Sequence, residues 1–209
     1  GFEKLVYGGL TKVFAGIVIA PIGGLIVGLL LTGLIITIFA NRKPAPVNKT
    51  FGRLQIISSA WFALTHGAND GQKTMGIIAL ILFSTGMIPE LDIPVWVIFA
   101  AAAAMGLGTF FGGYKVIKTL GVKITRLKPY QGFAAETGGG IMLAAFAVLG
   151  IPASTTHAIT GTIMGSGAAR RKRAVRWKVS RQIIFSWIIT IPGAAGLGIG
   201  FTYLIHLFV

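Results

Sequence analysis

The feature that most constrains this chain is the stretch 129–170, in which two apolar runs are separated by Gly150 and Pro152. Three consecutive hydroxyl side chains follow the break: Ser154, Thr155 and Thr156. Serine and threonine are strong N-cap residues, so the pattern predicts two half-helices, the second beginning at this polar tip. Because the first amide groups of a helix are unpaired and carry its positive dipole end, the tip is a candidate anion site.

The first of these runs also contains an acid, Glu136, followed by Thr137 and three glycines. A carboxylate within a membrane segment costs a few kcal/mol, so its presence there predicts a cation, a proton or a polar cavity beside it. An anion site and a carboxylate in one element together suggest coupled ion binding.

Composition places the chain in a membrane. Of its 209 residues 54% are hydrophobic and only 11% are charged, which is too apolar for a soluble domain of this length. The net charge of +14 does not require a nucleic acid partner, because sixteen of the nineteen Lys and Arg lie in three short segments, 41–53, 115–128 and 170–181. Such clustering is typical of cytoplasmic loops. The absence of cysteine excludes disulfide and thiolate chemistry.

We therefore expect an all-α integral membrane protein of the cell membrane, with transmembrane helices, a broken helix and a re-entrant helical hairpin. The expected elements are a helix in 1–40, a loop at 41–53, a broken helix at 54–87, a helix at 94–113, the hairpin at 129–170 and a final helix at 182–208. Both ends of the hairpin adjoin basic segments, which predicts a re-entrant element or an unusually short pair of spans. Glu90 and Asp92 mark an external loop, and both termini are expected outside.

The break in the 54–87 helix is predicted from the segment 66–73, which reads HGANDGQK. Two glycines flank Asn69 and Asp70, a composition that favours an unwound turn. Unwound backbone at membrane depth is tolerated only where it is buried in protein or lines a cavity. The segment is therefore predicted to mark a site.

Asp70 and Glu136 are the acids placed at membrane depth. Each either pairs with a base such as Lys73 for structure alone, or helps to bind a monovalent cation or a proton, with Asn69 adding an oxygen ligand. The hydroxyls of the hairpin tip suit a tetrahedral oxyanion, for which Gln72 and Lys73 are further candidate donors. A structural role explains the presence of Lys73 as well as phosphate binding does: the side chain either pairs with Asp70 or extends its charge towards water.

An enzyme remains an alternative, because Ser154, His157 and Asp70 can be written as a catalytic triad. Against it, the chain has no G-x-S-x-G elbow, and Ser154 lies only three residues from the histidine. A metal site formed by His66, His157 and the two acids lacks the usual ligand spacing. We expect His157 to orient the tip, and His206 to lie at the membrane interface. The basic segment 170–181 either anchors the topology or contacts anionic lipids.

Two apolar segments, 15–24 and 186–195, share a similar pattern and proline position but are predicted to run in opposite directions. This is what inverted repeats produce, although chance similarity between apolar helices explains it as well. The chain begins at Gly1 rather than Met, so we expect it to be a fragment or a processed piece.

Two long motifs, HGANDGQKTMG at 66–76 and PASTTHAITGTIMGSG at 152–167, with AAETGGG between them, resemble the inorganic phosphate transporter family over residues 51–209. Members of that family contain two inverted repeats and move phosphate together with sodium ions or protons. The resemblance implies phosphate contacts at the three tip hydroxyls. It also implies cation coupling at Asn69, Asp70 and Glu136, beside which we place Thr137.

Only one copy of each motif is present, so the resemblance implies one half of an inverted-repeat transporter, with 1–40 as the last helix of the first repeat and 54–209 as the second. The expected function is phosphate import by sodium or proton symport through alternating access, without an organic cofactor. The expected partners are phosphate, the coupling ion, the lipid bilayer and an N-terminal half or a second copy of the chain. A permease for sulfate, a Ser/His hydrolase and a passive channel or assembly subunit are the alternatives.

Overall fold

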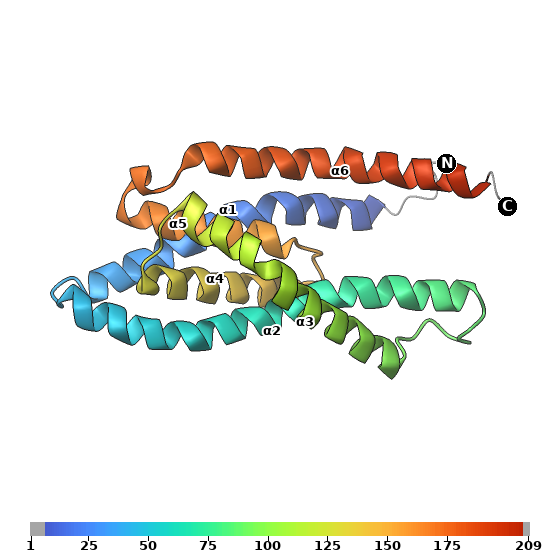
Figure 1. Cartoon of the computed structure of the whole chain (residues 1–209), viewed down its shortest axis with the longest axis horizontal. Coiled ribbons are helices and arrows are strands. Elements are labelled where there is room, and N and C mark those ends of the chain that lie inside the picture. The colour runs from blue at the N-terminus through green and yellow to red at the C-terminus, as the bar shows by residue number, and fades with distance from the viewer. Residues whose placement is uncertain (1–6, 207–209) are drawn as a thin grey trace. The chain divides into compact units, whose positions relative to one another are not determined.

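The computed structural model describes residues 7–206, all of whose regular elements are helical (Figure 1). In chain order these are α1 (Tyr7–Ile38), α2 (Pro44–Ser84), α3 (Val95–Lys118), a π-helical turn (Thr119–Ile124), α4 (Pro129–Val148), α5 (Thr155–Arg170), a 3₁₀ turn (Lys172–Ala174) and α6 (Trp177–His206). The chain divides into two units after Val175, the second of which contains α6. Residues 1–6 and 207–208 of the expected terminal helices lie outside the described residues.

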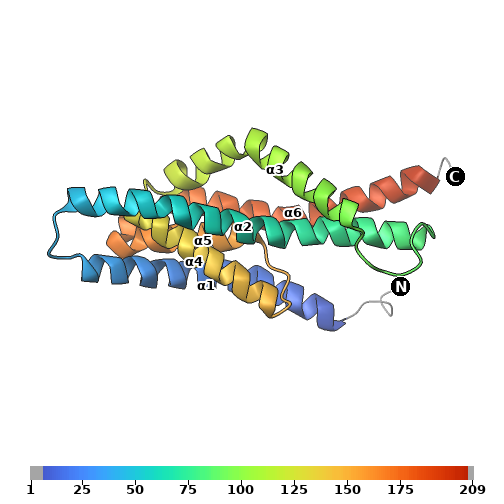
Figure 2. The ribbon, with the colours of Figure 1, turned by 90° about the horizontal axis from the view of Figure 1, so that it is seen from below.

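Helices α1 and α5 lie side by side because small residues face each other along both. Every fourth residue of one face of α1 is buried: Gly16, Ala20, Gly24, Gly28 and Thr32. On α5, Gly161 and Gly165 face the backbone carbonyls of Pro21 and Leu25 so closely that no side chain would fit between them. Small residues allow membrane helices to approach to backbone contact, so this pattern fixes the position of α5 on α1 (Figure 2).

Helix α4 packs against α1, α2 and α5, and its three glycines explain how it fits. A Cβ atom on Gly138 would lie 2.8 Å from Val27 of α1, and one on Gly139 would lie 3.0 Å from Phe62 of α2. One on Gly140 would overlap the indole of Trp61. The triple glycine thus serves helix packing on more than one side of α4.

The predicted break at 66–73 is wrong, because α2 runs without interruption from Pro44 to Ser84. Side chains in the segment support the helix rather than replace it. His66 and Lys73 contact Asp70 from positions four before and three after it, and Asn69 donates to the carbonyl of Thr65. Pairs at these spacings stabilise a helix, which offsets the low helix propensity of the two glycines.

The predicted loops are also shorter than expected. Lys43 is extended and Pro44 begins α2, so Lys49 and Arg53 of the expected 41–53 loop lie on a helix. Similarly, α3 and its π-helical turn continue to Ile124 where the sequence predicted an end at 113. The final helix begins at 177, five residues earlier than predicted.

The predicted break between the two half-helices at Gly150 and Pro152 is confirmed, since α4 ends at Val148 and α5 begins at Thr155. Gly150 has a φ of +60°, a conformation that glycine adopts at little cost, and Ser154 is the N-cap of α5. Within residues 7–206, three helical segments are long and apolar enough to cross a membrane: Tyr7–Ile38, Val95–Tyr114 and Trp177–Ile205. The chain is thus a multi-pass, helical membrane protein.

Candidate functional site

The hairpin tip carries the three predicted hydroxyls in three different environments. The Ser154 oxygen accepts a hydrogen bond from the backbone N–H of His157 at 3.4 Å, as an N-cap does. Thr155 is buried, with 4% of its surface exposed, whereas Thr156 is exposed. The first turn of α5 therefore presents one capping, one buried and one accessible hydroxyl.

Asp70 joins α2 to this tip. Its Oδ2 atom accepts a hydrogen bond of 2.8 Å from the hydroxyl of Thr155 and lies 3.1 Å from Nε2 of His66. Its Oδ1 atom accepts from the ammonium group of Lys73 at 3.0 Å. The two motifs that are far apart in the sequence thus meet at one carboxylate, which bonds to both a cation and a hydroxyl.

Lys73 makes a second link between the same elements. Its ammonium group donates to the backbone carbonyl of Ala153 at 2.8 Å, directly before the N-cap of α5. The side chain is 46% exposed, so the protein encloses this interaction only in part. Lys73 therefore holds the hairpin tip against α2 in this structure. The neighbouring side chain of Gln72 is exposed.

Asn69 lies one residue earlier and is buried, with 8% of its surface exposed. Its amide donates to the carbonyl of Thr65 at 2.9 Å and to the carbonyl of Leu143 on α4 at 3.4 Å. The amide nitrogen is thus used to attach α2 to α4, which leaves the amide oxygen as the group that could act as a ligand.

Glu136 lies in a separate polar cluster. Its carboxylate accepts hydrogen bonds from the hydroxyl of Ser58 at 2.5 Å and from the amide of Gln55 at 3.3 Å, while Thr137 is half-buried beside it. Ser58 and Asp70 are twelve residues apart on α2, which corresponds to about 18 Å along a helix. The two acids that the sequence analysis placed at membrane depth therefore lie at different levels of the bundle.

Sequence analysis missed the two partners of Glu136 and the role of the Ala153 carbonyl. A signal for the former was present, because polar residues recur on α2 at helical spacing: Gln55, Ser58, Thr65 and Asn69. A polar stripe along an otherwise apolar helix indicates a face directed at the protein interior. Among residues 7–206, no group of three or more His, Asp or Glu side chains is placed to hold a metal ion.

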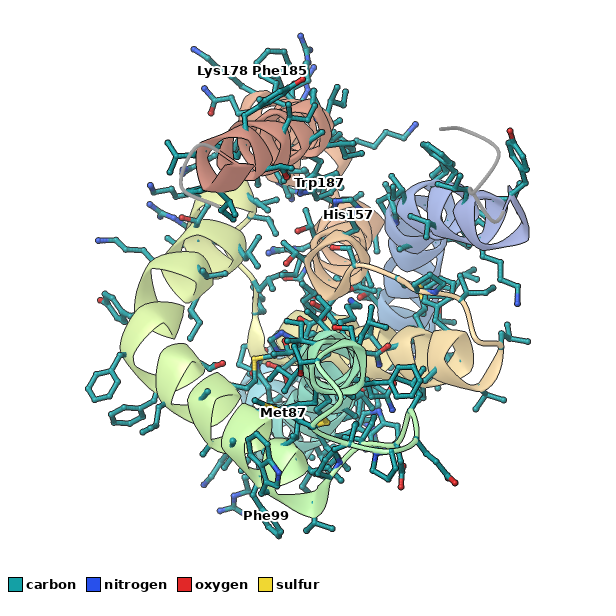
Figure 3. All side chains as sticks on the ribbon, turned by 90° about the vertical axis from the view of Figure 1, so that its right-hand side faces the viewer. Met87, Phe99, His157, Lys178, Phe185 and Trp187 are labelled. Carbon is teal, nitrogen blue, oxygen red and sulfur yellow. The ribbon has the colours of Figure 1, made fainter. Side chains whose placement is uncertain are left out.

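The geometry at Ser154 does not resemble that of a hydrolase. The Ser154 hydroxyl accepts a hydrogen bond from a backbone N–H group. The His157 side chain is buried and hydrogen-bonded to the backbone of Ile17 on α1. Figure 3 shows His157 on α5 among the packed helices, whereas Phe99 on α3 points outward. A nucleophile and its base must be within hydrogen-bond reach of each other, and no such bond is formed here.

The described residues form helices of a multi-pass membrane protein, and polar side chains connect several of these helices. The chain is a member of the phosphate transporter family, whose model matches residues 36–198. The family and the relatives described below are transporters rather than enzymes.

Relatives in the same family cover nearly all of the chain. It is 50% identical over 93% of its length to a probable low-affinity inorganic phosphate transporter of Rhizobium meliloti, and 40% identical over 95% to one of Bacillus subtilis. A solved structure, the sodium-dependent phosphate transporter, matches 90% of the chain with a TM-score of 0.63 and 26% identity. The chain spans 59% and 60% of the two relatives, and 60% of the solved structure's chain.

Proposed function

We propose that this chain forms part of a secondary active transporter that imports inorganic phosphate together with a cation. The observation that carries the proposal is the 2.8 Å hydrogen bond between Thr155, at the N-terminus of α5, and Asp70 on α2. This hydrogen bond places the N-terminus of α5, the proposed anion site, next to a carboxylate. An ion bound at one of the two is therefore expected to affect binding at the other. The membership of the phosphate transporter family supports phosphate as the anion.

In this proposal, phosphate binds at the first turn of α5. The ligands are the backbone amides of that turn, the hydroxyls of Ser154 and Thr156, and the side chain of Gln72. The hydroxyl of Thr155 donates its single proton to Asp70, so it becomes a donor to phosphate only if it releases that carboxylate. Lys73 becomes a direct ligand only if it releases the Ala153 carbonyl, which it contacts at 2.8 Å. Hydroxyls and amides bind an oxyanion without adding a fixed charge, which allows the anion to leave again.

The coupling cation is proposed to bind near Asp70 and Asn69, with Glu136 and Thr137 as a second location. Oxygen ligands of this type suit sodium, and the similarity to a sodium-dependent phosphate transporter favours sodium over protons. Because a bound cation offsets the charge of phosphate, each ligand is expected to raise the affinity of the other by the same factor.

The rest of the transporter is proposed to come from sequence beyond this chain, since relatives are longer. That part would supply an inverted repeat, with the α4–α5 hairpin moving against it during alternating access. A second copy of the chain is the alternative source. The segments 41–53, 115–128 and 170–181 are proposed to face the cytoplasm, and both termini the outside.

The experiment that tests the proposal is uptake of radiolabelled phosphate into proteoliposomes. The chain is reconstituted with and without the remaining portion of a longer relative, under an imposed sodium gradient and then a proton gradient. Uptake that requires one gradient, and is lost in Asp70→Asn, supports symport and identifies the ion.

Two further arms separate the alternatives. Excess unlabelled sulfate should leave phosphate uptake unchanged, whereas equal competition would indicate a general oxyanion permease. Uptake that proceeds equally without any cation gradient would indicate a passive channel. Absence of uptake under every combination, with correctly inserted protein, would reject the proposed function.

A further inference from the structure

A pocket of about 210 Å³ lies where α1 passes into α2, next to the beginning of α4. None of the candidate phosphate or cation residues lines it. Its wall combines apolar side chains from the end of α1 with polar and basic groups from the segments around Pro44 and Lys128. A wall with one apolar side and one charged side suits a ligand that has an apolar part and a charged part.

The apolar side is formed mainly by Ile35, Ile36 and Phe39. All three side chains are half-buried; the two isoleucines lie in the last turn of the apolar span that ends at Ile38, and Phe39 follows directly after it. In a membrane-spanning helix, this turn lies where hydrocarbon gives way to the headgroup region. An alkyl chain is therefore available in the bilayer at the level of this wall.

The charged side is formed by Arg42 and Lys128, which come from two separate segments. Among the described residues, neither forms a salt bridge with an acid. Helices α2 and α4 begin beside the pocket at Pro44 and Pro129, and the positive ends of their dipoles add to the same potential. Two arginine or lysine side chains converging on one pocket suit a phosphate group.

One of the residues that line the pocket, Asn48, has a polar atom without a partner. The Oδ1 atom of Asn48 is buried and receives no hydrogen bond from the described residues. A buried acceptor left unpaired is costly, so a ligand that brings a donor here gains binding energy. A hydroxyl group attached near the phosphate provides that donor, and inorganic phosphate alone provides no apolar portion for the opposite wall.

We propose that this pocket binds an anionic phospholipid with a hydroxylated headgroup. Its phosphate lies between Arg42 and Lys128, a headgroup hydroxyl donates to Asn48, and an acyl chain lies along the end of α1. Basic pockets between membrane helices are favourable places for anionic headgroups. This site is independent of the proposed transport function, because it shares no residue with the phosphate and cation residues.

The test is native mass spectrometry of the 209-residue chain in detergent, titrated with phosphatidylglycerol or with phosphatidylcholine bearing the same acyl chains. We expect phosphatidylglycerol to bind about tenfold more tightly. The double variant Arg42→Gln with Lys128→Gln should remove most of this preference. The matched control, Lys49→Gln with Arg53→Gln, makes the same charge change at exposed positions outside the pocket and should retain it.

A third variant separates the pocket from general charge attraction. Val47→Phe fills part of the cavity without changing any charge, and should weaken phosphatidylglycerol binding about as much as the double variant. Circular dichroism and gel filtration check that each variant is folded. If the double variant misfolds, Val47→Phe and the comparison of the two lipids still show whether the anionic lipid binds in the pocket.

Three results would overturn the proposal. Equal loss in the control pair would mean that the lipid responds only to net charge. Unchanged binding in Val47→Phe would place the lipid outside the pocket. Displacement of the lipid by inorganic phosphate at matched concentration would mean that the pocket selects the free anion.

Discussion

The hydroxyl of Thr155 donates a hydrogen bond of 2.8 Å to Asp70, although the two residues are 85 positions apart in the sequence. Thr155 is buried, whereas the carboxylate also contacts His66 and Lys73. A hydrogen bond to a charged acceptor is stronger than one between neutral groups. This contact therefore links the carboxylate on α2 directly to the first turn of α5.

Removal of this contact should weaken both cation and phosphate binding. Thr155→Val keeps the shape of the side chain but removes the donor, and a charge-assisted hydrogen bond contributes roughly 1.5–3 kcal/mol. We expect the apparent phosphate affinity to fall about tenfold, and its dependence on the cation to weaken. Thr156→Val is the comparison: this exposed hydroxyl should affect phosphate affinity alone, as phosphate binding measured at several sodium concentrations would show. An identical response of the two variants would contradict the prediction.

Lys73 is expected to stabilise the hairpin tip. Lys73→Met removes the donors to Asp70 and to the Ala153 carbonyl, so backbone amides at the start of α5 should exchange faster with solvent. Because the side chain is partly exposed, the cost should be only about 1 kcal/mol. Hydrogen exchange measured by mass spectrometry checks this, with the exposed neighbour Gln72→Met as the control. Equal protection of the tip amides against hydrogen exchange in both variants would mean that Lys73 does not stabilise the tip.

The contact between α1 and α5 should tolerate no side chain at its centre. A Cβ atom on Gly28 would overlap the backbone carbonyl of Thr162, and a helix rather than a side chain would have to move. We expect Gly28→Ala to destabilise the protein by about 1–3 kcal/mol, as overpacking does. Gly33→Ala lies on the same helix with no other atom within 4 Å, and should be neutral or slightly stabilising. Thermal unfolding in detergent compares the two, and equal midpoints would contradict the prediction.

The Glu136 cluster should act independently of the Asp70 cluster. Ser58→Ala removes a donor to Glu136 and is predicted to alter cation affinity. Thr155→Val acts on Asp70, which lies about 18 Å from Ser58 along α2. Effects at sites this far apart add within about 0.5 kcal/mol. A double-mutant cycle on sodium affinity tests this, and a larger interaction energy would mean that the two acids belong to one site.

The predicted topology can be tested directly because the chain contains no cysteine. Single variants Lys43→Cys, Lys123→Cys and Arg173→Cys should react with a membrane-impermeant maleimide from the cytoplasmic side only. Asp92→Cys should react from the opposite side. Reaction of Lys123→Cys and Asp92→Cys from the same side would contradict the arrangement derived from the basic segments.

Much of the architecture followed from the sequence. The apolar runs identified helices. The break and the hydroxyls after it predicted the start of a second half-helix, whose N-cap is Ser154, because capping depends on local residue types. The unbroken course of α2 did not follow. Its glycines and the Asn-Asp pair favour a turn locally, but side chains three and four positions apart, together with packing on α4, stabilise the helix.

By itself, the sequence determined which polar side chains stand out in the apolar helices: the tip hydroxyls, Asp70 and Glu136. Only the tertiary structure decided how they are grouped, placing Asp70 against Thr155 and Glu136 against Ser58. The physical reason is that composition and caps are local properties, whereas the partner of a buried carboxylate depends on how helices pack. Here that packing is set by glycines on α1, α4 and α5, where backbone and side chains of neighbouring helices approach too closely for any larger residue.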